Sequence, residues 1–192
     1  MRVLGLCVCI IGIKNALGGD IMLMVVSLAT GTLAGEALRI DDALNRLGLW
    51  LQSRMSPGEG STFAEGFVTA SLLYCVGAMA IVGSIESGLR NDQGIIITKS
   101  VLDGASSVIF ASTLGVGVLF SAFAVLIYQG SIELFAWYLQ DVFSEGLIMQ
   151  ISAVGGIMIM AIGLNLALNA KFKTANMLPG FIFAALYYYM VG

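Results

Sequence analysis

Residues 77–118 read GAMAIVGSIESGLRNDQGIIITKSVLDGASSVIFASTLGVGV, and this stretch decides how the chain folds. It lies within two long apolar segments that cover residues 63–129, yet it contains Glu86, Lys99 and Asp103. An ionisable side chain inside a bilayer costs roughly 2.5–3.5 kcal/mol on insertion scales, so it normally has a partner, a water-filled cavity or a task. The stretch therefore predicts membrane-spanning helices that carry a polar site.

The composition places the whole chain in a membrane. Hydrophobic residues make up 58% of the sequence and charged residues 11%, whereas a soluble domain averages about 25% charged. The 192 residues leave no room for a sizeable soluble domain beside the spans, so we predict one integral membrane domain, 1–192. The net charge is −3, and the Lys and Arg residues are scattered singly, which gives no reason to expect a nucleic-acid partner.

Histidine is absent from the sequence, and this excludes several kinds of chemistry. Without histidine there is no imidazole acid or base, no Ser-His or Cys-His nucleophile pair and no His metal site. Cys7, Cys9 and Cys75 lie in apolar runs without a CxxC spacing, so we expect small buried hydrophobic residues, not a disulfide framework or a zinc site. We therefore expect no metal, no cofactor and no enzymatic activity.

The apolar segments predict an all-α, polytopic transmembrane bundle of about seven spans, with six as the alternative count. Residues 41–55 are expected to form an amphipathic helix on the membrane surface, and 56–62 a flexible loop. Small residues at GSIESG, 83–88, predict a break or re-entrant turn, and residues 114–117 divide a run that is too long for one span. The predicted spans are 3–17, 21–38, 63–89, 95–113, 118–128, 147–168 and 176–191.

The distribution of positive charge favours seven spans over six. With seven, Arg2, Arg39, Lys171 and Lys173 fall on one side, and the acidic segment 133–145 falls on the other. Cytoplasmic loops carry an excess of Lys and Arg, so this arrangement predicts a cytoplasmic N-terminus.

Two glycine patterns suggest how the helices pack. Gly31 and Gly35 form a GxxxG motif, whose small faces let two helices approach closely. In addition, GLCVCIIGIKNAL at 5–17 is similar to GIMIMAIGLNLAL at 156–168, and SLATG at 27–31 to NMLPG at 176–180. With seven spans the two hairpins cross in opposite directions, which is an inverted repeat of the kind found in secondary transporters. Chance similarity between Gly- and Ile-rich segments is the alternative explanation.

The chain resembles the bacterial membrane-protein family known as domain of unknown function 554. The matching pieces cover almost the whole chain: SLATGTLAGEALRID, GSIESGL, ITKSVLDGASSVIFASTLGVGV, LIYQG, ISAVGG, IGLN and ANMLPG. The resemblance implies a multi-pass protein of the bacterial inner membrane with transporter-like architecture, and it supplies no substrate. Members of that family usually have another hydrophobic segment ahead of the one that here follows Met1, so we expect that this chain lacks the family's first segment.

The candidate site combines charges with hydroxyl groups. Lys99 and Asp103 are four residues apart and therefore share a helix face. Glu86 would add a second carboxylate, and the set would bind a small cation or zwitterion, or pass a proton. Mutual neutralisation of Lys99 and Asp103, or a Lys99 side chain that reaches the headgroups, is the structural alternative. The remaining candidate ligands are Ser84, Ser87, Ser100 and, from the other half of the chain, Asn165.

Three classes of function fit this pattern to different degrees. We expect a small-solute or ion transporter, because charges, broken segments and an inverted repeat occur together. A non-catalytic membrane scaffold or assembly subunit, associating through Gly31 and Gly35, is the alternative. An intramembrane enzyme would have only a Ser-Lys pair available, and nothing in the spacing selects one. Besides membrane lipids, we expect a second copy of the chain as partner, most simply in a dimer.

Overall fold

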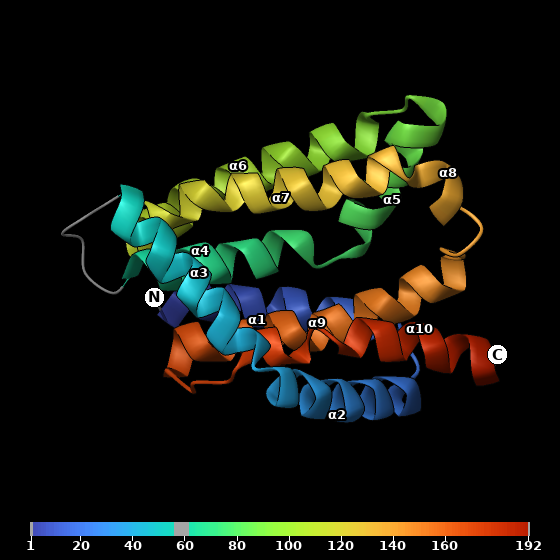
Figure 1. Ribbon diagram of the computed structural model, residues 1–192, viewed down its shortest axis with the longest axis horizontal. Coiled ribbons are helices and arrows are strands. Elements are labelled where there is room, and N and C mark those ends of the chain that lie inside the picture. Colours follow the sequence, from blue (N-terminus) through green and yellow to red (C-terminus); the bar gives the residue numbers. More distant parts are fainter. Residues whose placement is uncertain (1, 56–61, 192) are drawn as a thin grey trace. The chain divides into compact units, whose positions relative to one another are not determined.

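The protein is described here by a computed structural model that covers residues 2–55 and 62–191. Ten α-helices and one 3₁₀ helix, without a strand, make up the ordered elements of these residues (Figure 1). The elements are α1 (Arg2–Ala16), α2 (Ile21–Leu38), α3 (Ile40–Met55), α4 (Thr62–Cys75), α5 (Ala78–Arg90), α6 (Gly94–Leu114), α7 (Gly117–Leu134), α8 (Ala136–Leu139), α9 (Glu145–Leu168), η1 (Thr174–Met177) and α10 (Gly180–Val191). The all-α prediction is confirmed.

The helices form two compact units that are interleaved in the sequence. The first unit contains α1, α2, α9, η1 and α10, and so joins the two ends of the chain. The second unit contains most of α3 together with α4, α5, α6, α7 and α8 from the middle of the chain. The chain therefore leaves the first unit after one hairpin and returns to it with another.

Every apolar segment expected to span the membrane contains helix, but the helices differ in length. Among the described residues, α2, α6, α7 and α9 are long and apolar enough to cross a bilayer. The pair α4 and α5, bent by 63°, makes a fifth crossing if it is one span. The remaining two, α1 and α10, have 15 and 12 residues. By length and composition there are thus four or five candidate spans, and the count of seven stays a prediction.

Four glycines let α1 and α9 meet backbone to backbone. A Cβ atom placed on Gly5 would lie 2.6 Å from the carbonyl oxygen of Gly163, and one on Gly163 would lie 2.7 Å from that of Gly5. Gly12 and Gly156 approach each other in the same way, with 2.6 Å in both directions. The helices run antiparallel, since the start of α1 meets the end of α9. No side chain fits between them at these positions.

The GxxxG motif of α2 packs inside the same unit. A Cβ atom on Gly31 would overlap the backbone of Gly180 at the start of α10, and one on Gly35 would overlap the backbone of Asn176 in η1. Asn176 is itself buried, and its side-chain oxygen accepts the Asp41 backbone N–H at 2.8 Å. Figure 1 shows α2 beside α10. Gly31 and Gly35 therefore make close backbone contacts within one chain.

The helix break lies earlier than the sequence suggested. Residues 83–88, GSIESG, are continuous helix in α5, and the chain bends at Val76 and Gly77 instead. Gly77 has φ +141°, a value that side-chain-bearing residues rarely adopt. Gly83 and Gly88 serve helix contacts: a Cβ on Gly83 would lie 3.0 Å from the Ile95 side chain, and one on Gly88 would overlap the α7 backbone. Tertiary packing thus outweighs their weak helix propensity.

The amphipathic segment 41–55 forms a helix, as predicted, and α3 begins at Ile40. Its Gly48 packs on α4, where a Cβ atom would lie 3.0 Å from the Ala64 side chain. Its position on a membrane surface stays a prediction. Residues 56–61 of the predicted loop lie outside the described residues, and Thr62 already begins α4.

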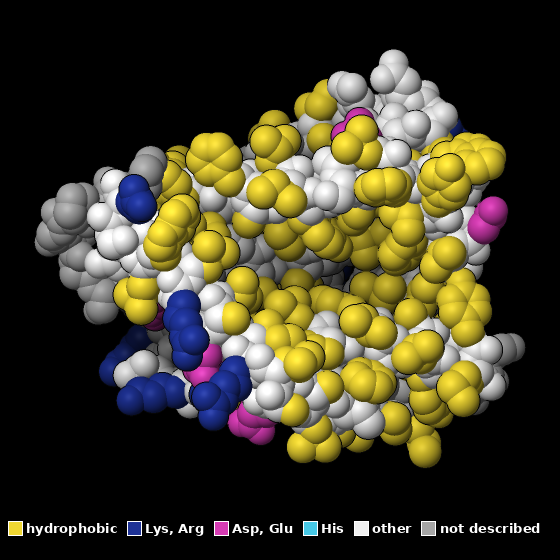
Figure 2. All heavy atoms as spheres, viewed as in Figure 1, with side chains coloured by type: hydrophobic (Ala, Val, Ile, Leu, Met, Phe, Trp, Pro, Cys, Tyr) yellow, Lys and Arg dark blue, Asp and Glu magenta, His cyan; other side chains and the backbone are white. Residues whose placement is uncertain are grey.

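The surface is apolar along the helices. Figure 2 shows hydrophobic side chains over much of the viewed face. Soluble monomers rarely expose contiguous apolar patches beyond a few hundred Å². A lipid environment accounts for this surface, whose exposed residues include Ile10, Val25, Val101, Val108, Leu126 and Ile127.

We predict that Gly12→Ala destabilises the protein, because the added methyl group meets backbone atoms that have no room to move. Overpacking of this kind costs about 1–3 kcal/mol, and the melting temperature in detergent, followed by circular dichroism, should fall by several degrees. Gly104→Ala is the matched control, since Gly104 lies within α6 and a Cβ there meets nothing within 4 Å. Equal melting temperatures for the two variants would contradict the close packing of α1 on α9.

Candidate functional site

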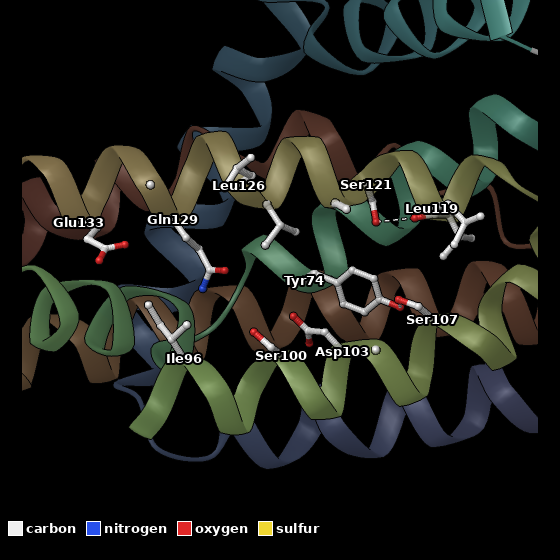
Figure 3. A pocket seen from close by; sticks show the side chains of 15 residues that line it. Tyr74, Ile96, Ser100, Asp103, Ser107, Leu119, Ser121, Leu126, Gln129 and Glu133 are labelled. Carbon is white, nitrogen blue, oxygen red and sulfur yellow. Dashed lines mark hydrogen bonds between the residues drawn. The ribbon is translucent and has the colours of Figure 1, made fainter. Parts of the chain in front are cut away.

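The second unit contains a cavity of about 440 Å³ between α6 and α7. Tyr74 of α4 also borders it, and Figure 3 shows its ring between the two longer helices. The cavity is partly polar, although α6 and α7 are apolar enough to cross a membrane. Its polar lining consists of Tyr74, Ser100, Asp103, Ser107, Ser121, Gln129 and Glu133.

Glycine packing on one side of α4 leaves room for this cavity. A Cβ on Gly117 would overlap the Phe63 carbonyl, and one on Gly66 would lie 2.7 Å from the Leu114 carbonyl oxygen. The beginnings of α4 and α7 and the end of α6 therefore meet closely. Farther along, Tyr74 stands between the helices, with its ring centroid 6.4 Å from that of Phe110 in an edge-to-face contact. The glycine contacts bring the helices together at one end. Beyond them, the Tyr74 ring lies between α6 and α7 and keeps these two helices apart.

Lys99 and Asp103 form the ion pair that their spacing predicts. The Lys99 ammonium donates a hydrogen bond to Asp103 Oδ2 one helical turn away. The Lys99 side chain is 9% exposed and that of Asp103 is 27% exposed. Asp103 borders the cavity, whereas Lys99 is not one of its lining residues. The Lys99 ammonium therefore contacts Asp103 without lining the cavity, and the Asp103 side chain borders the cavity (Figure 3).

Glu133 supplies the second carboxylate of the cavity. The Ser87 hydroxyl of α5 donates to Glu133 Oε1 at 2.7 Å, which ties the half-helix after the break to the end of α7. The sequence analysis placed Glu133 in the acidic segment 133–145 between two predicted spans and did not include it in the site. The register of the α6–α7 hairpin would have found it, because Glu133 lies one turn beyond Gln129, which faces Ser100 across the cavity in Figure 3.

The other polar groups of the lining differ in whether they have hydrogen-bond partners. Ser107 donates to Tyr74 Oη at 3.0 Å, and Ser121 donates to the Val118 carbonyl oxygen at 2.7 Å within its own helix. The Gln129 side-chain nitrogen is buried and has no hydrogen-bond partner among the described residues. A buried amide N–H without an acceptor costs about 1–3 kcal/mol, so water or a bound solute is expected to accept its hydrogen bond. The cavity thus contains groups suited to a polar occupant.

The structure does not bring every predicted site residue to this cavity. Ser100 lines it and Ser87 contacts it through Glu133, but Ser84 is buried and donates to the Ala80 carbonyl oxygen at 2.8 Å. Glu86 forms an ion pair with Arg90 at 3.2 Å and is not a lining residue. Two carboxylates, Asp103 and Glu133, therefore line the cavity, at separate places along it, and Glu86 is not one of them (Figure 3).

Asn165 belongs to the first unit, where its amide holds a loop. Its Nδ2 group donates to the Phe172 carbonyl oxygen at 2.8 Å, and its Oδ1 accepts the Phe172 N–H at 2.7 Å. These two bonds secure the turn that follows α9, in which Asn169 and Lys171 have positive φ values. Within the described part of the chain, no group of three or more Cys, Asp or Glu side chains is placed to hold a metal ion.

Comparison with known proteins places this architecture in a family. The family described as protein of unknown function (DUF554) matches residues 1–189. The chain belongs to this family. It is 37% identical over 161 residues to the uncharacterized membrane protein YdfK of Bacillus subtilis (strain 168), covering 84% of this chain and 67% of YdfK. It is 30% identical over 166 residues to the uncharacterized protein YqgA of Escherichia coli (strain K12), covering 84% of this chain and 70% of YqgA.

No solved structure matches this DUF554 chain significantly. The resemblance to this family in the sequence is thus confirmed, and the chain is a membrane protein of an uncharacterised family. Because neither relative has a named activity, the function of the α6–α7 cavity has to be argued from its own residues.

For the DUF554 chain we predict that Asn165→Ala loosens the turn after α9. Loss of the acceptor for the Phe172 N–H should accelerate amide hydrogen exchange at Phe172. Ser152→Ala is the control, because the Ser152 hydroxyl bonds only within its own helix, to the Ile148 carbonyl oxygen at 2.7 Å. Unchanged exchange together with a loss of solute binding would instead assign Asn165 to a ligand site.

Proposed function

We propose that the protein is a small-solute or ion transporter of the bacterial inner membrane, and that its substrate path passes through the cavity between α6 and α7. The observation that carries this proposal is the cavity itself, which two carboxylates line between helices apolar enough to span a bilayer. Charged groups inside a bilayer are costly and typically mark substrate or ion pathways. The carboxylates suit a small cation or the ammonium group of a zwitterion.

The packing of the first unit supports an inverted repeat. In the sequence match, Gly5 corresponds to Gly156, and Ala16 corresponds to Ala167. A Cβ on Gly5 would lie 2.5 Å from the Ala167 nitrogen, and a Cβ on Gly156 would lie 2.5 Å from the Ala16 nitrogen. The match pairs Gly5 with Gly156 and Ala167 with Ala16, so it converts the contact of Gly5 with Ala167 into the contact of Gly156 with Ala16. A two-fold relation between the hairpins requires this equivalence. We infer that the two terminal hairpins are inverted copies, a frequent plan among secondary transporters.

The orientation follows from the positive-inside rule and can be tested at the two ends of α9. We expect a membrane-impermeant maleimide to label Asp141→Cys in intact spheroplasts and Lys173→Cys only after disruption, because Lys171 and Lys173 should be cytoplasmic. Both sites are exposed, and α9 separates them in the chain. Cys7, Cys9 and Cys75 are first replaced by alanine. The reverse labelling pattern would contradict the cytoplasmic N-terminus.

The transport proposal is tested by uptake of a panel of labelled cations and amino acids into proteoliposomes. We expect Asp103→Asn and Glu133→Gln each to reduce uptake of the transported solute at least tenfold. Losing one member of a buried charged contact costs about 2–5 kcal/mol, and about 1.4 kcal/mol corresponds to a factor of ten.

Two further carboxylates make the uptake experiment specific. Glu65→Gln is the control, because Glu65 is exposed in the first turn of α4. Glu86→Gln distinguishes the site predicted from the sequence, which includes Glu86, from the cavity in the structure, whose lining does not include it. In the structure Glu86 forms an ion pair with Arg90. Loss of uptake in Glu86→Gln but not in Glu133→Gln would contradict the cavity as the substrate path.

The alternative function, a scaffold or assembly subunit, draws support from the exposure of α6. Only 11% of its apolar window is buried, against 67% for α9, so α6 has a long face available to another chain. We propose that a second copy covers part of this face in a dimer. Association through Gly31 and Gly35 has less support, because these glycines already contact η1 and α10. An intact dimer with no flux for any solute would favour the scaffold.

A further inference from the structure

We infer that the second unit binds the acyl chain of an anionic phospholipid in an apolar groove between α3, α4 and α7, and that Arg54 contacts the phosphate group of this lipid. The inference is independent of the proposed transport, because the groove and the α6–α7 cavity have no lining residue in common. They lie on different faces of α7, which contributes side chains to both.

The groove has a volume of about 900 Å³, about twice that of the α6–α7 cavity. Its lining is almost entirely hydrocarbon, and the described residues that form it include no charged side chain. Leucine and aromatic side chains from three helices make up most of it: Leu47 and Leu51 of α3, Phe67 of α4, and Phe120 and Phe123 of α7. In a bilayer, lipid tails are the apolar ligand that surrounds such a groove.

The length of the groove matches an acyl chain. On α7 its lining residues run from Phe120 to Ile132. Twelve residues of α-helix rise about 18 Å, and one leaflet contributes half of a hydrocarbon core that is about 30 Å thick. The groove is therefore long enough to hold one lipid tail through one leaflet.

A lipid tail fits this lining better than a helix of a second copy does. Helices in a membrane associate through small residues that let their backbones approach each other. In the lining that the structure describes, Ala124 and Ser131 are the small residues on α7, and Tyr128 lies between them. This face therefore lacks the small-xxx-small spacing, whereas a flexible acyl chain can follow large side chains.

Arg54 continues the face of α3 that borders the groove. Leu47, Leu51 and Arg54 follow one another at intervals of four and three residues, so they form one stripe along the helix. The exposed Arg54 guanidinium lies 5.9 Å from the centroid of the Trp50 ring. Tryptophan is typical of the headgroup level of a bilayer, and a guanidinium suits the oxygen atoms of a phosphate.

The basic end of α3 lies at one end of the groove. Gly48 of α3 packs on Ala64 near the beginning of α4. The beginning of α4 in turn meets the beginning of α7, where Gly117 contacts Phe63. Thus α3 crosses near the beginning of α7, and the groove continues along α7 from there. A phosphate held by Arg54 therefore has its acyl chain beside the groove.

The charges at this end of the groove suit an anion. Among the described residues, no carboxylate forms an ion pair with Arg54. Glu65 precedes the groove-lining Phe67 by two residues and so lies on nearly the opposite side of α4. Anionic lipids attract basic residues at the membrane surface. The positive charge beside the groove thus favours an anionic headgroup over a zwitterionic one.

The test compares two lipids that have the same acyl chains and differ in headgroup charge. The purified chain is titrated in detergent with dioleoyl phosphatidylglycerol, which is anionic, or with dioleoyl phosphatidylcholine, which is zwitterionic. Native mass spectrometry reports the lipids bound and the oligomeric state. We expect one phosphatidylglycerol per chain to be retained in preference to phosphatidylcholine. Equal retention of the two lipids would overturn the assignment of an anionic headgroup.

Removing the positive charge should weaken binding of the anionic lipid. We expect Arg54→Gln to raise the Kd for phosphatidylglycerol about fivefold and to leave that for phosphatidylcholine unchanged. Arg46→Gln is the matched control, because exposed Arg46 lies about 100° around α3 from Leu47 and off the stripe. Equal losses in the two variants would indicate attraction to the general surface charge and contradict a site at Arg54.

Filling the groove should weaken binding of both lipids. Ala124→Phe places a ring where the acyl chain is expected, and Ala37→Phe, at an exposed position of α2 in the first unit, is its control. Unchanged lipid retention in Ala124→Phe would contradict the groove as the acyl-chain site. If that variant instead lost the mass of a dimer and kept its lipid, the groove would belong to a second copy.

A measurement on the unmodified protein decides the matter if Ala124→Phe does not fold. Phosphatidylglycerol with a photoreactive group in its acyl chain is bound and irradiated, and the crosslinked peptides are identified by mass spectrometry. We expect crosslinks to groove residues on α7, among them Phe123 and Ile127. Crosslinks confined to helices that do not line the groove would overturn the inference.

Discussion

Contact between backbones at glycine is the constraint on which the architecture depends. Lipid tails are as apolar as the helix surfaces, so helices in a membrane associate by close packing and not by a hydrophobic drive between them. In the first unit, Gly5, Gly12, Gly156 and Gly163 bring α1 and α9 together without intervening side chains. In the second unit, Gly117 brings the beginning of α7 against the beginning of α4. The cavity between α6 and α7 lies beyond this contact.

The charges then occupy the space that the packing leaves. Lys99 is buried and holds Asp103, and Ser87 holds Glu133, so each carboxylate is oriented by a group outside the cavity lining. Replacing such a buried pair by apolar residues is often neutral or stabilising in other proteins. The pair is therefore better explained by a requirement for ligands and charge in this cavity than by stability alone.

The sequence predicted the parts of the structure that depend on local signals. The apolar segments, the division near Gly115 and the Lys99–Asp103 pair all follow from composition or from spacing within one helix. The position of the break in α4–α5 did not follow, because the small residues at 83–88 are kept helical by contacts with other helices. Glu133 was missed for a related reason: it is far from Asp103 in the chain, and only the register of the α6–α7 hairpin brings both side chains to the lining of one cavity.

The first unit has a consequence for how the protein is made. Its two hairpins stand at opposite ends of the chain, with the whole second unit between them. At a synthesis rate of about 5–20 residues per second, α1 waits on the order of ten seconds for α9 to emerge. During that interval the glycine faces of the first hairpin have no partner, and a newly inserted neighbouring chain could occupy them. The expression level, and chaperones that bind the chain during its insertion, should therefore influence whether this protein assembles correctly.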